Sequence, residues 1–327
     1  MLSRVAESLY WMSRYIERAD AVARFVDVNL QLMLGMPVGL SEQWEPLVIT
    51  SGDQDDFTKR FGRPSRENVI RFLTFDRDNP NSIVECIRRA RENARSIREN
   101  ISSDMWEQLN AWHLAMSGAS EDRAMSDPYD FFQRIKLESH LFLGLTDSTL
   151  SHGEGWHFCR VGRMLERADK TSRILDVKYF ILLPSVDEAG TPFEDIQWSA
   201  LLNSASALEM YRKRWGPIAP AQVVSFLLLD RDFPRSVLHA VRGAETSLHT
   251  ISGTPMDAWA NPAEQLLGRL RAELTYADVA QIMARGLHEF VDDLQVRLNL
   301  VGTAIHDTFF AMRPVGEPDA GGALGAA

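Results

Sequence analysis

The chain has 327 residues, a formal net charge of −10 and 45% apolar residues, a composition typical of globular domains large enough to bury a core. The acidic balance excludes general nucleic-acid binding, which requires a basic face. The two cysteines, Cys86 and Cys159, supply no disulfide framework, and no apolar run is long enough for a secretory signal or a membrane span. We therefore expect a cytoplasmic protein without membrane contact.

Helical periodicity runs through the chain, and strand signals are nearly absent. This pattern predicts an all-α fold. The first helix is expected over 5–34, where apolar residues recur every three or four positions without a proline. Further helices are predicted over 42–60, 65–75, 80–101, 103–117, 128–151, 155–183, 194–213, 219–229, 234–251, 258–274 and 276–311. The segment 313–327, rich in Gly, Ala and Pro, is predicted to be a disordered tail.

The first predicted helix contains the charged motif RYIERAD at 14–20. At about 100° per residue, Glu17, Asp20, Arg24 and Asp27 form one acid–base column beside an apolar arc. Arg18 lies apart from this column. The candidate site residues of this helix are Arg14, Glu17, Arg18, Asp20, Arg24 and Asp27.

The motif DRDxP occurs at 76–80 and again at 230–234. Asp78 and Asp232 are good helix N-caps, and the prolines two positions later suit a first helical turn, where no backbone donor is needed. The motif is therefore interpreted as a helix start, with a ligand site at the helix mouth as the alternative.

The helix predicted over 80–101 carries a stripe of arginines that lie within about 80° of one another. Its members are Arg88, Arg91, Arg95 and Arg98. Guanidinium groups bind carboxylates and phosphates in a planar, bidentate geometry, so the stripe is a candidate anion-binding site. The alternative is local pairing with Glu92 and Glu99 on a solvated face.

The charged motif returns as RMLERAD at 163–169, which is 149 residues further along the chain. FLTFDRDNPNSI at 72–83 likewise matches FLLLDRDFPRSV at 226–237, with an offset of 154. Because these segments recur in the same order, they predict an internal duplication. Two pseudo-repeated multi-helix units, over 1–152 and 153–312, are expected to pack into one domain that resembles a helical bundle. The second column consists of Glu166, Asp169, Arg173 and Asp176, and the candidate site residues of this second helix are Arg163, Glu166, Arg167, Asp169, Arg173 and Asp176.

Three interpretations of the two columns remain open. The two helices exchange buried Glu–Arg pairs about a pseudo-two-fold axis, the columns bind a ligand or partner, or they are surface ladders of ion pairs. Catalysis would need carboxylates whose environments separate their pKa values, and nothing in the sequence indicates such environments. The sequence has no Cys/His cluster and no glycine-rich phosphate loop, so we expect neither a metal nor another cofactor.

RYIERAD, RMLERAD and the segment DRDNPNSIVECIRRARENARSIRENISSDMWEQLN at 76–110 together resemble the bacterial alpha-E family, an all-helical family named for its Glu-Arg motif. The resemblance covers the chain apart from its tail. It implies that the motif residues here are Arg14, Glu17, Arg18, Asp20, Glu166, Arg167 and Asp169. It also implies a circularly permuted ATP-grasp protein as partner, often with a transglutaminase-like cysteine protease nearby, in a system that synthesises or modifies peptides.

We therefore predict a non-catalytic helical accessory protein that binds the ATP-grasp ligase or its peptide substrate. In this interpretation the partner supplies the nucleotide and the metal. The alternative is an enzyme that acts on peptide or amide substrates, with Glu17 or Glu166 as its acid–base residue.

Overall fold

The structure is a computed structural model that describes residues 1–34, 44–182 and 192–311. Within these ranges every regular element is a helix, which confirms the predicted all-α fold. Up to residue 149 the helices are α1 (Ser3–Leu34), α2 (Glu45–Ser51), α3 (Gln54–Phe61), α4 (Arg66–Ile70), α5 (Ile83–Ser96), α6 (Ser103–Ser117), α7 (Glu121–Ser126) and α8 (Pro128–Thr149). The later helices are α9 (Glu154–Leu182), α10 (Pro192–Ser204), α11 (Leu208–Trp215), α12 (Pro220–Leu229), α13 (Val237–Ser252), α14 (Pro262–Tyr276), α15 (Val279–Arg285) and α16 (Leu287–Ile305).

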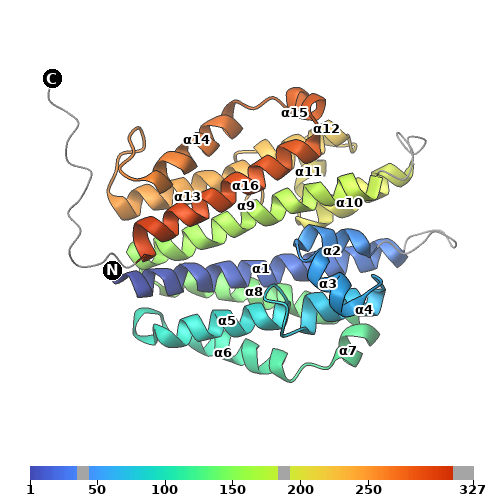
Figure 1. Cartoon of the computed structure of the whole chain (residues 1–327), viewed down its shortest axis with the longest axis horizontal. Coiled ribbons are helices and arrows are strands. Elements are labelled where there is room, and N and C mark those ends of the chain that lie inside the picture. The colour runs from blue at the N-terminus through green and yellow to red at the C-terminus, as the bar shows by residue number, and fades with distance from the viewer. Residues whose placement is uncertain (35–43, 183–191, 312–327) are drawn as a thin grey trace.

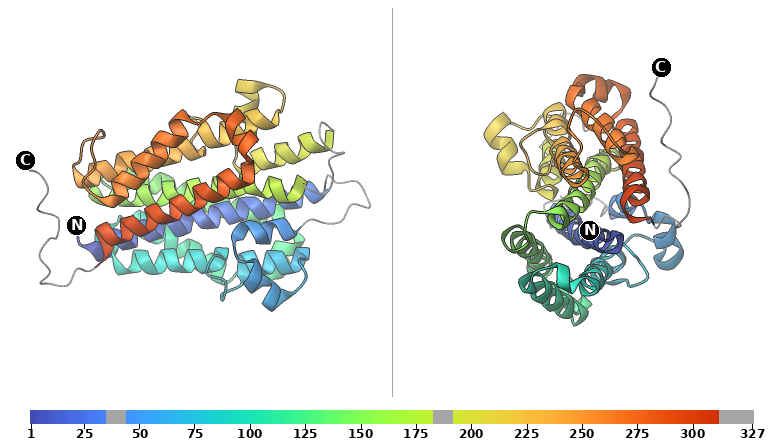
Figure 2. Two further views of the ribbon diagram at one scale, coloured as in Figure 1. Left: turned by 45° about the horizontal axis from the view of Figure 1, so that its top comes forward. Right: turned by 90° about the vertical axis from the view of Figure 1, so that its left-hand side faces the viewer.

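Two long helices, α1 and α9, lie side by side and run parallel through the middle of the molecule (Figure 1). Helices α5, α6 and α8 form a group with α1, and α13, α14 and α16 form a group with α9. Seen end-on, the two central helices lie between these groups (Figure 2). Helix α2 packs on α9 and α10 packs on α1, so the segment after each central helix crosses to the other one. The buried apolar side chains accordingly form one core.

Helices α5 and α13 start later than the DRDxP motifs predict. Their N-caps are Ser82 and Ser236, whose side chains accept hydrogen bonds from backbone N–H groups in the first turn. The proposed caps, Asp78 and Asp232, lie before these helices and are therefore a wrong prediction. The first aspartate of each motif instead accepts a hydrogen bond from the backbone N–H of the second, a side-chain turn that competes with helix formation.

Three predicted helices are interrupted where a residue adopts a positive φ. They are the helices predicted over 42–60, 194–213 and 276–311. The residues at the breaks are Gly52 (φ 83°), Ser206 (φ 51°) and Gly286 (φ 109°). A left-handed residue ends a helix, but apolar periodicity continues across each break, so the pattern alone does not reveal it. The division into units 1–152 and 153–312 stays a prediction, and the predicted tail at 313–327 lies outside the described residues.

The backbones of α1 and α9 come close together at Gly162. A Cβ atom at this position would lie only 2.3 Å from the carbonyl oxygen of Tyr10, well inside contact distance. Glycine is therefore required here because it alone lets the two backbones meet.

The substitution Gly162→Ala is expected to push α1 away from α9 and to lower the free energy of unfolding by about 3 kcal/mol, at the upper end of overpacking costs. The matched control is Gly144→Ala in α8, where an added Cβ meets nothing within 4 Å. There alanine is expected to stabilise the helix by about 0.5–1 kcal/mol, since it loses less backbone entropy than glycine. Urea denaturation measures both, and equal effects would contradict this packing.

Candidate functional site

The two Glu-Arg motifs face each other where α1 packs against α9. Glu17 is 4% exposed and Glu166 is 0% exposed, and the small residues Ala19 and Ala168 are fully buried beside them. A carboxylate that is removed from water in this way must be paired, because an isolated buried charge is strongly destabilising.

Each glutamate is bound by the arginine of the other motif. Arg167 donates from Nε and Nη2 to the two carboxylate oxygens of Glu17 over 2.7 and 2.8 Å. Arg18 donates from Nε and Nη2 to the two oxygens of Glu166 over 2.6 and 3.1 Å. Both pairs are bidentate, the stronger form of a charge-assisted hydrogen bond. Of the three interpretations left open above, the buried exchange of Glu–Arg pairs is the one that the structure contains.

Further cations surround both carboxylates. Arg14 donates from Nε to Glu166 over 2.8 Å, and Lys170 Nζ lies 3.7 Å from an oxygen of the same carboxylate. On the other side, Nη1 of Arg235 lies 3.4 Å from Glu17. Each glutamate therefore contacts more positive than negative groups.

Arg235 is a site residue that sequence reasoning missed. It follows the second DRDxP motif directly, and the residue at the matching place after the first motif is Asn81. Asn81 accepts a hydrogen bond from Nη1 of Arg18 over 2.7 Å. Both DRDxP turns thus place a polar side chain against the Glu-Arg cluster, and the recurrence of DRDxP in the sequence was the signal available.

The next aspartate of each column pairs with an arginine of its own helix. Asp20 accepts from Arg24 Nε over 2.8 Å and from Arg235 Nη2 over 2.8 Å. Asp169 accepts from Arg173 Nε over 3.0 Å. These pairs brace the columns along α1 and α9.

The last aspartate of each column pairs with an outer helix. Lys136 Nζ on α8 lies 2.6 Å from Asp27, and His288 Nδ1 on α16 lies 2.6 Å from Asp176. Every carboxylate of the two predicted columns therefore has a basic partner.

Ion pairing keeps the motif glutamates ionised. Burial acts to raise the pKa of Glu17, but the guanidinium groups of Arg167 and Arg235 outweigh it, so this pKa lies below its usual value. The same balance lowers the pKa of Glu166, where Arg18 and Arg14 outweigh burial. Both side chains are carboxylates at neutral pH and have no proton to donate.

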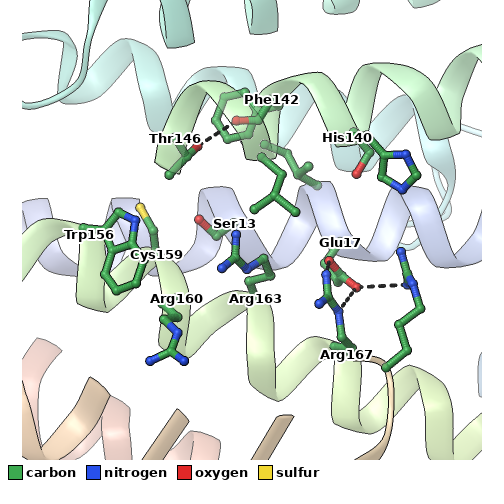
Figure 3. A pocket seen from close by; sticks show the side chains of 14 residues that line it. Ser13, Glu17, His140, Phe142, Thr146, Trp156, Cys159, Arg160, Arg163 and Arg167 are labelled. Carbon is green, nitrogen blue, oxygen red and sulfur yellow. Dashed lines mark hydrogen bonds and ion pairs between the residues drawn. The ribbon is translucent and has the colours of Figure 1, made fainter. Parts of the chain in front are cut away.

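A small pocket opens beside this cluster, between α1, α8 and α9 (Figure 3). It offers about 30 Å³ of space for water-sized groups, and its lining includes Ser13, Glu17, His140 and Arg163. Arg24 Nη2 lies 3.0 Å from Nε2 of His140, and burial lowers the pKa of this histidine, so we treat its imidazole as neutral. Sequence reasoning missed His140, because nothing near it in the chain marks it.

Each arginine of the predicted stripe has a local partner, but α5 ends at Ser96, so Arg98 lies in a short 3₁₀ turn after the helix that was predicted to carry it. The pairs are Arg88–Glu85, Arg91–Glu92, Arg95–Glu92 and, by stacking, Arg98–Trp106. None of these arginines lines the pocket in Figure 3. Local pairing accounts for their geometry, and the use of the stripe as an anion site stays a prediction.

Neither cysteine is activated as a nucleophile. Burial raises the pKa of the Cys86 thiol to about 12 and that of the Cys159 thiol to about 11, so both stay protonated. Across the described ranges, no three side chains of His, Cys, Asp or Glu are grouped closely enough to hold a metal ion. In the same part of the chain, no helix combines the length and the apolar character needed to cross a membrane.

Comparison with known proteins places this helical chain among uncharacterised relatives. The Alpha-E family model, described as a predicted alpha-helical domain with a conserved ER motif, matches residues 1–310. An uncharacterised protein of Mycobacterium bovis is 23% identical over 347 aligned residues, which cover 97% of this chain and 38% of that protein. Uncharacterised proteins from two strains of Mycobacterium tuberculosis match to the same extent. The chain thus spans less than half the length of the curated relatives it matches. No solved structure matches it significantly.

The substitution Glu166→Gln is expected to lower the free energy of unfolding by about 3–5 kcal/mol, because it leaves Arg14 and Arg18 buried without their carboxylate. The control is Glu92→Gln on α5, whose side chain is 35% exposed and whose loss should cost less than about 1 kcal/mol. Thermal and urea denaturation of the two variants measure the difference. Similar losses would contradict a structural role for the buried pair.

The buried pairs also predict how stability depends on pH. Since the pKa values of Glu17, Glu166 and Asp169 are lowered by folding, their contribution is complete above the unfolded pKa of about 4 and is lost as the pH falls through the lower folded values. The free energy of unfolding should therefore fall steeply below about pH 4, and Glu166→Gln should make this fall shallower. Urea denaturation from neutral to acidic pH tests this, and identical slopes would contradict it.

Proposed function

The chain belongs to the Alpha-E family, and we propose that it acts as a non-catalytic helical accessory protein, which binds an ATP-grasp ligase or the peptide substrate of that ligase. The ligase supplies the nucleotide, the metal ion and the bond-forming chemistry. A transglutaminase-like protease of the same system is a further expected partner.

The observation that carries this proposal is the internal use of the Glu-Arg motifs. A general acid needs a proton at its working pH, and a general base needs a carboxylate oxygen that is open to substrate. Glu17 has neither, because its pKa is lowered and Arg167 binds both of its oxygens. Glu166 is held in the same way by Arg18. The competing function, an enzyme with one of these glutamates as acid–base residue, therefore has no observation in its favour.

The length of the relatives adds support. In the mycobacterial proteins the matched region is 38% of a longer polypeptide, so a helical unit of this kind occurs there together with much additional chain. An accessory protein acts together with another protein, and the longer mycobacterial polypeptides join the helical region to further chain in this way.

The proposal predicts a complex that changes the rate of ligation. A tagged ATP-grasp protein from the same genome should retain this chain during purification, and ATP-dependent amide formation, followed by ADP release, should rise severalfold when the chain is added. The controls are the ligase alone and this chain alone.

Absence of a complex together with an unchanged ligation rate would contradict the proposal. So would turnover of a peptide or amide by the isolated chain that Glu17→Gln abolishes while the far-UV circular dichroism spectrum is retained.

A further inference from the structure

Arg163 is a largely buried cation without a carboxylate of its own. Its side chain is 14% exposed, and the closest carboxylate oxygen, on Asp147, lies 3.9 Å from Nη1. Within the described ranges its buried Nε has no hydrogen-bond partner. Burial, followed by repulsion from Arg167, lowers the pKa of this guanidinium. An arginine in this environment is destabilised until an anion reaches it.

Arg14 is the residue that matches Arg163, 149 positions earlier in the chain. Unlike Arg163, it has both a carboxylate and a hydroxyl group as hydrogen-bond acceptors. Its Nε donates to Glu166 over 2.8 Å and its Nη1 donates to the Tyr10 hydroxyl over 2.9 Å. Its guanidinium carbon also lies 5.0 Å from the centre of the Trp11 ring. The two arginines are equivalent in the sequence but not in their surroundings.

Two features of the second motif account for the different surroundings of Arg163. The carboxylate that matches Glu166 is Glu17, which is already occupied by Arg167 and Arg235. The residue that matches Tyr10 is Cys159, which has no phenol to accept from a guanidinium. A thiol in place of an aromatic ring also leaves space, and Cys159 lines the pocket beside Arg163 (Figure 3).

The pocket is suited to a planar monoanion. Arg163 and Ser13 both line it (Figure 3), and the Ser13 hydroxyl, which lies within hydrogen-bond reach of the Cys159 sulfur, can turn its single proton toward a bound anion instead. A guanidinium fork matches a carboxylate in two parallel hydrogen bonds. The space of about 30 Å³ fits such a group. Glu17, which lines the pocket, and Asp147, which lies 3.9 Å from Arg163, repel a doubly charged phosphate more strongly than a monoanion.

We propose that the pocket between α1, α8 and α9 binds the carboxylate group of a peptide, with Arg163 as its main donor and Ser13 as a second donor. The assignment of the carboxylate to a peptide rests on the proposed function, whereas affinity of the pocket for a carboxylate does not. The bound group completes the buried ion-pair cluster by supplying the anion that Glu166 supplies to Arg14.

The test uses the isolated chain and four probes: acetyl-Ala-Glu-Ala-amide, acetyl-Ala-Gln-Ala-amide, acetyl-Ala-Ala-Ala with a free C-terminus, and inorganic phosphate. Calorimetry measures affinity, and the NMR signal of the Arg163 Nε–H group reports its environment. At least one carboxylate peptide should bind at least about tenfold more tightly than the glutamine peptide, as expected for a charge-assisted pair, and should shift this signal. The glutamate and C-terminal probes identify the source of the carboxylate.

Arg163→Gln should reduce this affinity at least about tenfold while leaving the melting temperature unchanged or higher, because it removes an uncompensated buried cation. Arg163→Lys, which keeps the charge but lacks the fork, should bind with intermediate affinity. Arg123→Gln on α7, whose side chain is 62% exposed, is the matched control and should bind normally. Arg14→Gln should lower the melting temperature.

Equal binding of the glutamate and glutamine peptides together with no binding of the free C-terminus would overturn the proposal. Tighter binding of phosphate than of either carboxylate, or carboxylate binding that Arg163→Gln leaves unchanged, would do the same. So would loss of the fold in Arg163→Gln comparable to that in Arg14→Gln, which would show that Arg163 already has its partner. A failure of this kind leaves the formation of a complex with the ligase unaffected, so the two proposals fail separately.

Discussion

The buried exchange of two Glu–Arg pairs is the constraint on which the rest of the structure depends. Glu17 and Glu166 lie in the interface of α1 and α9, at 4% and 0% exposure, and a buried ion that loses its partner costs several kcal/mol. Both pairs form together in the parallel arrangement and register that α1 and α9 adopt. The exchange therefore fixes the central layer, and Gly162 allows the close approach that it needs.

The same pairing distinguishes the charged residues that already have a partner within the protein from Arg163. The two motif glutamates, which the alternative prediction assigned to acid–base catalysis, accept hydrogen bonds at both oxygens from arginines on the facing helix. Arg163 differs from these groups, because its buried Nε has no hydrogen-bond partner in the described residues and its closest carboxylate oxygen, on Asp147, lies 3.9 Å away. The paired charges lie in the interface of α1 and α9, and Arg163 is the charge to which the proposed carboxylate site assigns a ligand.

Much of this was predictable from the sequence. Helical spacing of apolar residues predicts an all-α fold, and the recurrence of Glu17-Arg18 as Glu166-Arg167 makes their exchange one of three interpretations, because both signals are local or repeated. The predicted start of a helix was wrong where a turn held by a side-chain hydrogen bond competes with the helix, as at Asp78. The recurrence of DRDxP marks the place of Arg235 in the sequence, but its contacts with the cluster, like those of His140, depend on how distant segments pack.

A double-mutant cycle between Glu17 and Arg167 tests the central claim most directly. The free energies of unfolding of Glu17→Gln, Arg167→Met and the double variant give the coupling between the two side chains, with the exposed pair Glu92 and Arg95 as reference. A buried, bidentate pair that holds α1 to α9 predicts a coupling of about 2–3 kcal/mol. A coupling below about 0.5 kcal/mol, no larger than that of an exposed pair, would contradict the account.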